Sequence, residues 1–152
     1  MINAIKQFFE QKLMQQHHST NNSEHTLQLA TAALLIEMMR MDDEISQAEQ
    51  QTAARIMQAK FRLSKTETND LMKLAEQETH QSADYHQFTS LINLHFSMAE
   101  KEKMVEYLWE IAYADNVLDK HEEYLVRKVA DLIGVSHRAF IAAKHRARTS
   151  TR

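Results

Sequence analysis

The sequence predicts a single all-α domain, a compact bundle of seven or eight helices with an internal duplication. Three observations predict this fold. The 152 residues include one glycine and no proline, so the positive-φ turns on which β-hairpins depend are scarce. Apolar residues make up 43% and charged residues 26% of the chain, which are ordinary globular values. A helix-start signal also recurs along the chain, each time before apolar residues at helical spacing.

Residues 1–22 form the first predicted segment, an amphipathic helix over 2–15 followed by a polar linker. Charged residues interrupt its apolar stripe, so the segment does not resemble a signal peptide. Such a short stripe favours packing on the core over a membrane or a partner. No apolar run reaches the roughly 18 residues that cross a bilayer, and we expect a cytoplasmic protein. The stripe consists of Ile2, Ile5, Phe9 and Leu13.

A capping box marks the start of four predicted helices. In this motif a Ser or Asp side chain accepts a hydrogen bond from the backbone N–H three residues later. A Glu at that later position reaches back to the backbone of the cap. Each copy precedes an apolar run at helical spacing, as a helix start requires. The four copies are Ser46–Glu49, Ser64–Glu67, Ser97–Glu100 and Asp119–Glu122.

The last helix boundary is marked by Gly134, which stands where a C-cap is expected, and by Ser136, which opens the final helix. Residues 23–152 therefore form the predicted helical domain, with connections of about two to six residues. The predicted helices span 2–15, 24–41, 46–60, 64–78, 83–96, 99–114, 119–133 and 136–148.

The helical domain contains a predicted internal repeat, in which residues 30–78 match residues 103–148. An offset of 73 residues aligns acidic and apolar residues at helix boundaries. Once one residue is dropped near Gly134, Leu63-Ser64 also aligns with Val135-Ser136. Two such repeats packed around a pseudo-twofold axis would bring equivalent loops together. The aligned pairs are Glu37 with Glu110, Asp42 with Asp115, Ile45 with Leu118, and Glu49 with Glu122.

The first loop of each repeat carries candidate metal ligands. In each loop an Asp follows a helix, an apolar residue comes next, and a Glu lies in the first turn of the following helix. Neighbouring carboxylates repel one another unless a cation or protons compensate. Oxygen ligands favour calcium, magnesium or manganese over zinc or copper. The candidate ligands are Asp42, Glu49, Asp115 and Glu122, with Glu37 and Glu110 on the incoming helices as additional candidates.

A structural role is the alternative interpretation of these acids, and on physical grounds alone it is the favoured one. Glu49 and Glu122 belong to capping boxes, and Asp side chains stabilise turns by bonding their own backbone. Neither loop is an EF-hand, because both lack the glycine and the bidentate Glu of that motif.

Three stretches of the chain carry a resemblance to a known family. They are Tyr107–Glu123 and Val129–Ser136 in the second repeat and Met41–Glu49 in the first, and Met41–Glu49 is similar to the family pattern of alanine-aspartate-glycine, an apolar residue, a helix cap and then glutamate. They resemble the tellurite-resistance protein TerB family, in its small stand-alone bacterial branch, over roughly residues 24–148. The resemblance implies an all-helical duplicated bundle whose acidic residues bind a divalent metal. It also implies association with stress-response or membrane-linked assemblies, and a cousin domain occurs in a membrane-anchored DnaJ-type co-chaperone.

The chain departs from this family pattern where glycine is expected, because it has Asp43 and Asn116 there, and Met41 replaces the first alanine. Asn tolerates positive φ, so we expect the turn to be retained. The positions that match the metal-binding pattern of the family are Asp42, Glu49, Asp115 and Glu122.

Other kinds of site are excluded or disfavoured. Without cysteine there is no disulfide, thiolate zinc site, iron–sulfur cluster or cysteine nucleophile, and one glycine is too few for a phosphate-binding loop. His121-Glu122 begins like a zinc-protease HExxH motif but lacks the second His. Core packing is favoured over ligand or partner binding for the methionine cluster and the central aromatic residues. A core-edge or surface position is favoured over metal ligation for the histidines of the middle region. These residues are Met38, Met39, Met41 and Met57; Tyr107, Trp109 and Tyr113; and His80, His86 and His95.

From Arg138 to the end the chain carries five Lys/Arg and no acid, whereas the preceding 137 residues have 13 Lys/Arg against 21 Asp/Glu. Such a basic end is able to contact nucleic acid or anionic lipid. The favoured interpretation is that these cations complement the C-terminal end of a helix. We expect a protein partner of unknown identity and no specific nucleic acid, and peripheral membrane association is compatible with the sequence but not supported by it.

The predicted function is a non-enzymatic TerB-like binding module that coordinates a divalent cation (calcium, magnesium or manganese) in stress response. The alternative is a metal-free interaction, scaffold or co-chaperone-like module that uses the N-terminal helix and an exposed Met/aromatic groove. A metal-dependent hydrolase is a remote alternative, because the sequence offers no positioned base, nucleophile or oxyanion donor.

Overall fold

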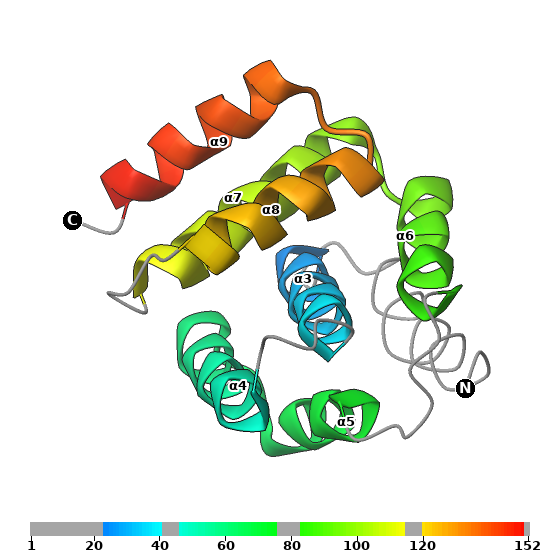
Figure 1. The fold of residues 1–152 in the computed structure, drawn as a ribbon, viewed down its shortest axis with the longest axis vertical. Coiled ribbons are helices and arrows are strands. Elements are labelled where there is room, and N and C mark those ends of the chain that lie inside the picture. Colours follow the sequence, from blue (N-terminus) through cyan, green and yellow to red (C-terminus); the bar gives the residue numbers. More distant parts are fainter. Residues whose placement is uncertain (1–22, 41–45, 76–82, 115–119, 151–152) are drawn as a thin grey trace.

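The computed structural model describes residues 23–40, 46–75, 83–114 and 120–150 (Figure 1). These ranges contain seven helices and no strand, so the all-α prediction is confirmed. The predicted helix over 2–15 and its linker lie outside the described residues. The helices are α3 (Ser23–Arg40), α4 (Gln47–Phe61), α5 (Lys65–Ala75), α6 (Ala83–His95), α7 (Met98–Ala114), α8 (Lys120–Leu132) and α9 (His137–Ser150).

Helix starts follow the predicted capping boxes. The N–H of Ser64 donates to Oε1 of Glu67 over 2.8 Å, and the N–H of Glu67 donates to Oγ of Ser64 over 3.1 Å. Ser46–Glu49 and Ser97–Glu100 make the same reciprocal pair. Three of the four predicted boxes are thus confirmed, and the fourth includes Asp119, which lies outside the described residues.

Two residues in the left-handed region end α4 and α8. Arg62 (φ 54°) follows α4, and Gly134 (φ 76°) follows α8. The next N–H in each case returns to the last turn of the helix: Leu63 donates to the carbonyl of Gln58 over 3.0 Å, and Val135 to that of Ala130 over 2.8 Å. These positions coincide in the predicted alignment of the repeats. The C-cap predicted at Gly134 is confirmed, whereas the arginine at the matching position carried no sequence signal for positive φ.

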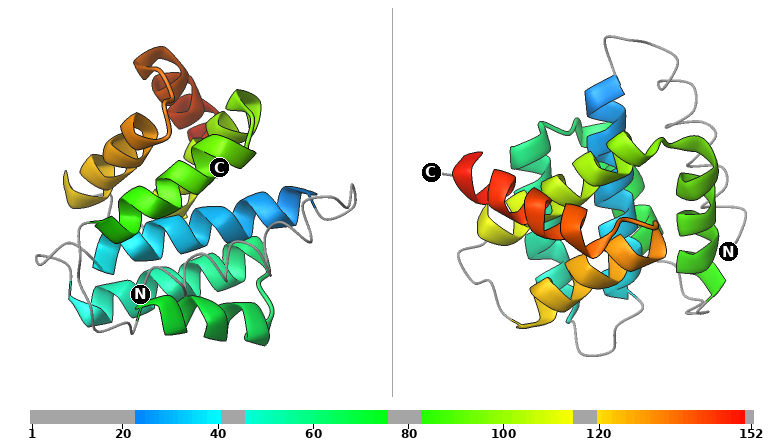
Figure 2. Two further views of the ribbon diagram at one scale, coloured as in Figure 1. Left: turned by 90° about the vertical axis from the view of Figure 1, so that its right-hand side faces the viewer. Right: turned by 90° about the horizontal axis from the view of Figure 1, so that it is seen from above.

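The seven helices pack around α3 and α7, which contact each other. Figures 1 and 2 show α3 between the pair α4 and α5 on one side and α7, α8 and α9 on the other. The contacts are reciprocal: α3 packs against α4, α5 and α8, and α7 packs against α8, α9 and α4. This pattern is what two repeats related by a pseudo-twofold axis would produce, although common ancestry of the repeats stays a prediction.

The core is built from the inner faces of these helices. In α3 the apolar positions from Leu29 to Ile36 are almost all fully buried, and Trp109 and Met104 of α7 lie against the same interior at 0% exposure. Met38, Met39 and Met57 are also buried, as are Tyr107 and Trp109. The core-packing interpretation of these methionine and aromatic residues therefore holds for these five side chains.

Candidate functional site

The structure describes the side chains of three of the six candidate ligands, Glu37, Glu49 and Glu110. Asp42 and Asp115 lie outside the described residues, and Glu122 lies in the first turn of α8 but its side chain is not among those described. Glu49 is an exposed residue in the first turn of α4, and Glu110 is half-buried near the end of α7. Glu37, near the end of α3, is fully buried.

The carboxylate of Glu49 is held by one of its two oxygens. Oε1 accepts the backbone N–H of Ser46 over 3.2 Å and its hydroxyl over 3.0 Å. In the described part of the chain, Oε2 accepts no hydrogen bond, and the residue is exposed. Capping and ligation are therefore compatible at Glu49, because the two functions use different oxygens of one side chain.

Within the described ranges, no three or more His, Asp or Glu side chains converge in a way that could hold a metal ion. Glu37 lies in the core, where an ionised carboxylate is costly without compensating polar groups. A metal site with several ligands therefore requires Asp42, Asp115 and Glu122, whose side chains are not among those that the structure describes.

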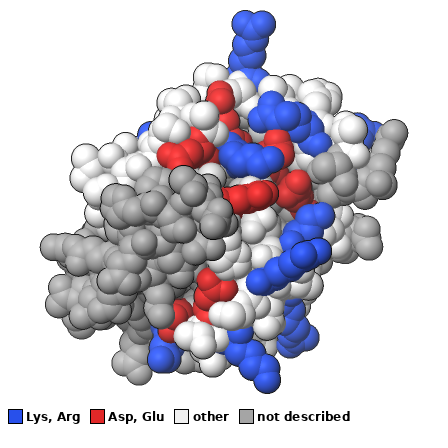
Figure 3. All heavy atoms as spheres, turned by 180° about the vertical axis from the view of Figure 1, so that it is seen from behind, with Lys and Arg blue, Asp and Glu red and all other residues white. Residues whose placement is uncertain are grey.

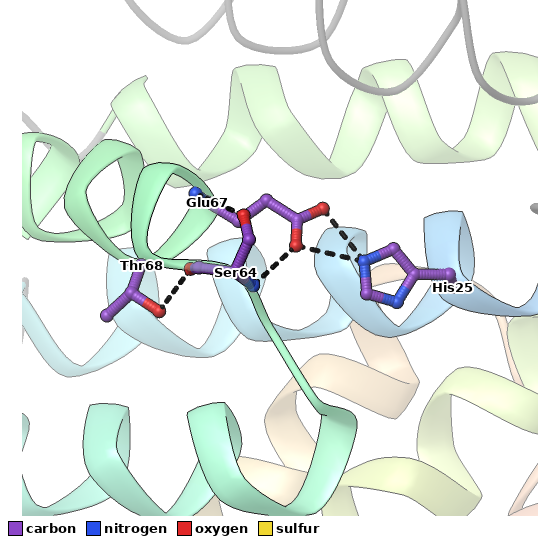
Figure 4. A network of polar contacts seen from close by, with 4 residues as sticks. All are labelled: His25, Ser64, Glu67 and Thr68. Atoms are coloured by element: carbon purple, nitrogen blue, oxygen red, sulfur yellow. Dashed lines mark hydrogen bonds and ion pairs between the residues drawn. The ribbon is translucent and has the colours of Figure 1, made fainter.

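A polar network that the sequence did not predict joins the first turn of α3 to the start of α5 (Figure 4). Nε2 of His25 lies 2.8 Å and 3.0 Å from the two carboxylate oxygens of Glu67, the residue that also completes the Ser64 capping box. Burial raises the pKa of the Glu67 carboxyl, but the hydrogen bonds from the Ser64 backbone and from His25 outweigh burial, and the net pKa is lowered. The adjacent Glu24 accepts the Tyr107 hydroxyl of α7 over 3.2 Å. The first turn of α3 thus contacts both α5 and α7.

A second network fixes α9 on α7. Glu106 of α7 is 7% exposed and binds Lys103 over 2.8 Å on its own helix and Nε of Arg146 on α9. Burial raises the pKa of Glu106, but the hydrogen bonds and charges of Lys103 and Arg146 outweigh burial. The net pKa is lowered, so the carboxylate is ionised at neutral pH. Figure 3 shows that Lys/Arg and Asp/Glu side chains adjoin one another on the face of the molecule seen from behind.

The seam between α8 and α9 carries further cations beside aromatic rings. Lys144 of α9 pairs with Glu123 of α8 over 3.4 Å, and its Nζ lies 5.0 Å from the centre of the Trp109 ring. Arg127 of α8 lies 5.9 Å from the centre of the Phe140 ring. Lys144 and Arg146 therefore act within the fold, a role that the count of basic residues in the sequence did not reveal.

The alternative function, a metal-free interaction module, predicts an exposed groove of Met and aromatic side chains. For the residues that the structure describes, this prediction is wrong. Met38, Met57 and Trp109 are core residues rather than surface ones. The large apolar side chains exposed in the described ranges are instead Leu94, Met98 and Tyr124. His95 is exposed, in agreement with the surface position expected for it, whereas the side chains of His80 and His86 are not described.

Comparison with known proteins gives one further finding. The family described as tellurite resistance protein TerB matches residues 28–145, most of the chain. Searches of curated proteins and of solved structures gave no match. In the described part of the chain, no helix has the length and hydropathy needed to cross a membrane.

Proposed function

We propose, since this chain belongs to the family of the tellurite resistance protein TerB, that it is a non-enzymatic cytoplasmic module that binds a divalent cation in a stress response of the tellurite-resistance type. The ligands would be Asp42 and Glu49 from the first repeat and Asp115 and Glu122 from the second. Glu110 is a candidate for a supporting role, whereas full burial makes Glu37 the weakest member of the predicted set.

The observation that supports this function best is the exposure and hydrogen bonding of the Glu49 carboxylate. It is the one member of the four whose side chain lies within the described residues, and it is exposed with Oε2 directed to no hydrogen-bond donor there. Its orientation is fixed by the cap, so a cation meets a carboxylate that has already lost much of its rotamer freedom. The repeat alignment predicts that Glu122 stands at the same point of α8.

Reciprocal packing supplies the second support. Because α4 packs on α7 and α8 packs on α3, each acidic loop joins two helices that contact the opposite repeat. A cation shared between the loops would relieve the repulsion among their carboxylates and hold the two repeats together. Calcium, magnesium and manganese are the ions that an all-oxygen ligand set favours.

A metal titration tests this function. Chelator-treated protein is titrated with calcium, magnesium, manganese or zinc while calorimetric heat and the melting temperature are followed. A specific site predicts saturable heat and a stabilisation that reaches about 2.7 kcal/mol at a hundredfold excess of ion over Kd. In a domain of this size that corresponds to a rise in melting temperature of about 5–10 °C.

Two double variants make the titration specific to the loops. Asp115→Asn with Glu122→Gln should abolish the effect, as should Glu49→Gln with Asp42→Asn. Asp131→Asn with Glu102→Gln removes the same charge from α8 and α7 away from the loops and should leave it intact. No shift with any ion would refute the metal function and favour a metal-free interaction module.

A further inference from the structure

The outer face of α9 is a basic surface that no other described helix covers. Phe140, Ala143 and Ala147 form its buried stripe. With 3.6 residues per turn, Arg138 and His145 fall on the opposite side, and both are exposed. Seen from above, α9 crosses in front of α7 and lies beside α8 (Figure 2, right).

The cations at the two edges of α9 hold the helix in place, so the outer face is presented on a rigid element. Arg146 pairs with the buried Glu106 on one edge, and Lys144 pairs with Glu123 on the other. Both retain exposure, 51% and 32% of the side chain, and thus add positive charge to the rim of the face. The exposed Arg148 lies about 15 Å along the helix from Arg138, at 1.5 Å per residue.

We propose that the outer face of α9 binds an acidic segment of a partner protein. The helix carries four Arg/Lys and two His and no acid, so an anionic partner is the electrostatic complement. Two further exposed positions of α9, Ala142 and Thr149, are small, which leaves room beside Arg138 and His145 for a helix or an extended segment.

The charge of the rest of the chain selects a short acidic segment over a nucleic acid. Residues 1–137 carry a balance of −8, so a polyanion that extends beyond α9 meets a like-charged body. A segment confined to the 14 residues of α9 avoids this repulsion, because charges beyond about 8–10 Å are screened at physiological salt. An anionic membrane is disfavoured because the outer face of α9 offers no large apolar side chain to insert, Ala142 being its one exposed apolar residue.

A binding assay with an oligoglutamate tests this inference. The probe has six glutamates, about 20 Å when extended at about 3.4 Å per residue, which matches the length of the 14-residue α9 at about 1.5 Å per residue, and it carries a fluorescein label for anisotropy. The full chain is used in chelator, so the outcome is independent of the proposed cation site. Saturable binding that weakens steadily between about 0.05 and 0.5 M salt is expected.

Two variants with equal loss of charge locate the surface. Arg138→Gln with Arg148→Gln should weaken binding about tenfold, the effect of two exposed ion pairs. Arg55→Gln with Lys65→Gln removes two exposed cations from α4 and α5 and should change binding less than twofold. Circular dichroism confirms that each variant is folded.

Three outcomes overturn the inference. The first is no binding of the oligoglutamate at low salt. The second is equal weakening by both variant pairs, which would show that total charge rather than α9 attracts the probe. The third is tighter binding of an oligothymidylate of equal charge, or of phosphatidylserine vesicles, which would assign the face to nucleic acid or to a membrane.

Discussion

Glu67 provides the sharpest test of how this fold is held together, because one carboxylate serves a helix cap and a long-range pair. It completes the Ser64 capping box at the start of α5 and also contacts His25 of α3, 42 residues away. Glu67→Gln keeps the cap, since an amide oxygen also accepts the backbone N–H, but removes the charge that faces the imidazole.

The expected cost follows from the exposure of the pair. Exposed ion pairs contribute about 0–1 kcal/mol, and a buried hydrogen bond to a charged group contributes about 1.5–3 kcal/mol. The side chains of His25 and Glu67 are 32% and 14% exposed, between these cases. We expect Glu67→Gln to lower the free energy of unfolding by about 1–1.5 kcal/mol and the melting temperature by about 3–5 °C.

The matched control is Glu49→Gln, which changes a capping-box glutamate of the same type that has no long-range partner within the described residues. Urea unfolding in chelator at pH 7 should show a smaller loss for this variant. A lowered pKa stabilises the fold above the unfolded-state pKa and loses that effect as pH falls through the folded-state value. The deficit of Glu67→Gln should therefore shrink below about pH 4.5.

Two results would refute this reasoning. Equal losses in Glu67→Gln and Glu49→Gln would show that the contact with His25 contributes nothing beyond the cap. Additive losses in a double-mutant cycle of Glu67→Gln with His25→Asn would show that the two side chains do not interact energetically.

Further predictions concern the helix ends and α9. Arg62→Gly should raise the free energy of unfolding by about 0.5–1 kcal/mol in urea, because glycine removes the steric cost at φ 54°. Gly134→Ala should lower it by about 1 kcal/mol through φ strain alone, since an added Cβ meets nothing within 4 Å; an unchanged midpoint in either variant would contradict this reading. Glu106→Gln should speed hydrogen exchange in residues 137–150 and cost about 1–2 kcal/mol at pH 7, because it leaves Arg146 of α9 without its carboxylate partner. The pKa of Glu106 is lowered in the folded state, so the cost of Glu106→Gln should fade as pH drops below about 4.5. Unchanged hydrogen exchange in α9 at pH 7 would refute the role of Glu106 in holding α9.

The helices were predictable because their boundaries are encoded locally. A capping box requires residues three positions apart, and the observed helix ends lie within three residues of the predicted ones. The reciprocal packing agrees with the pseudo-twofold arrangement that the repeat predicts, while the duplication itself stays a prediction. Arg62 shows where local prediction fails, because arginine has no preference for the left-handed region; its positive φ accompanies the hydrogen bond from the Leu63 N–H to the Gln58 carbonyl that ends α4.

Contacts between distant helices escaped prediction. Nothing in the sequence near His25 indicates Glu67, and the basic count of the last helix gave no sign that Arg146 and Lys144 face acids on α7 and α8. For the acidic loops the candidate residues could be identified from the sequence. The structure adds that the capping bonds of Glu49 use Oε1 alone, so within the described residues Oε2 remains available to a cation.

The reciprocal contacts of α3 and α7 have a consequence for how the domain folds and unfolds. The helices α3–α5 and the helices α7–α9 form two sets, and each set leaves part of α3 or α7 to be covered by the other, so neither set encloses an interior of its own. Cutting the chain between them would expose apolar surface on both pieces at once. The two predicted repeats therefore form a single cooperative unit, and a destabilising substitution in one should lower the stability of both.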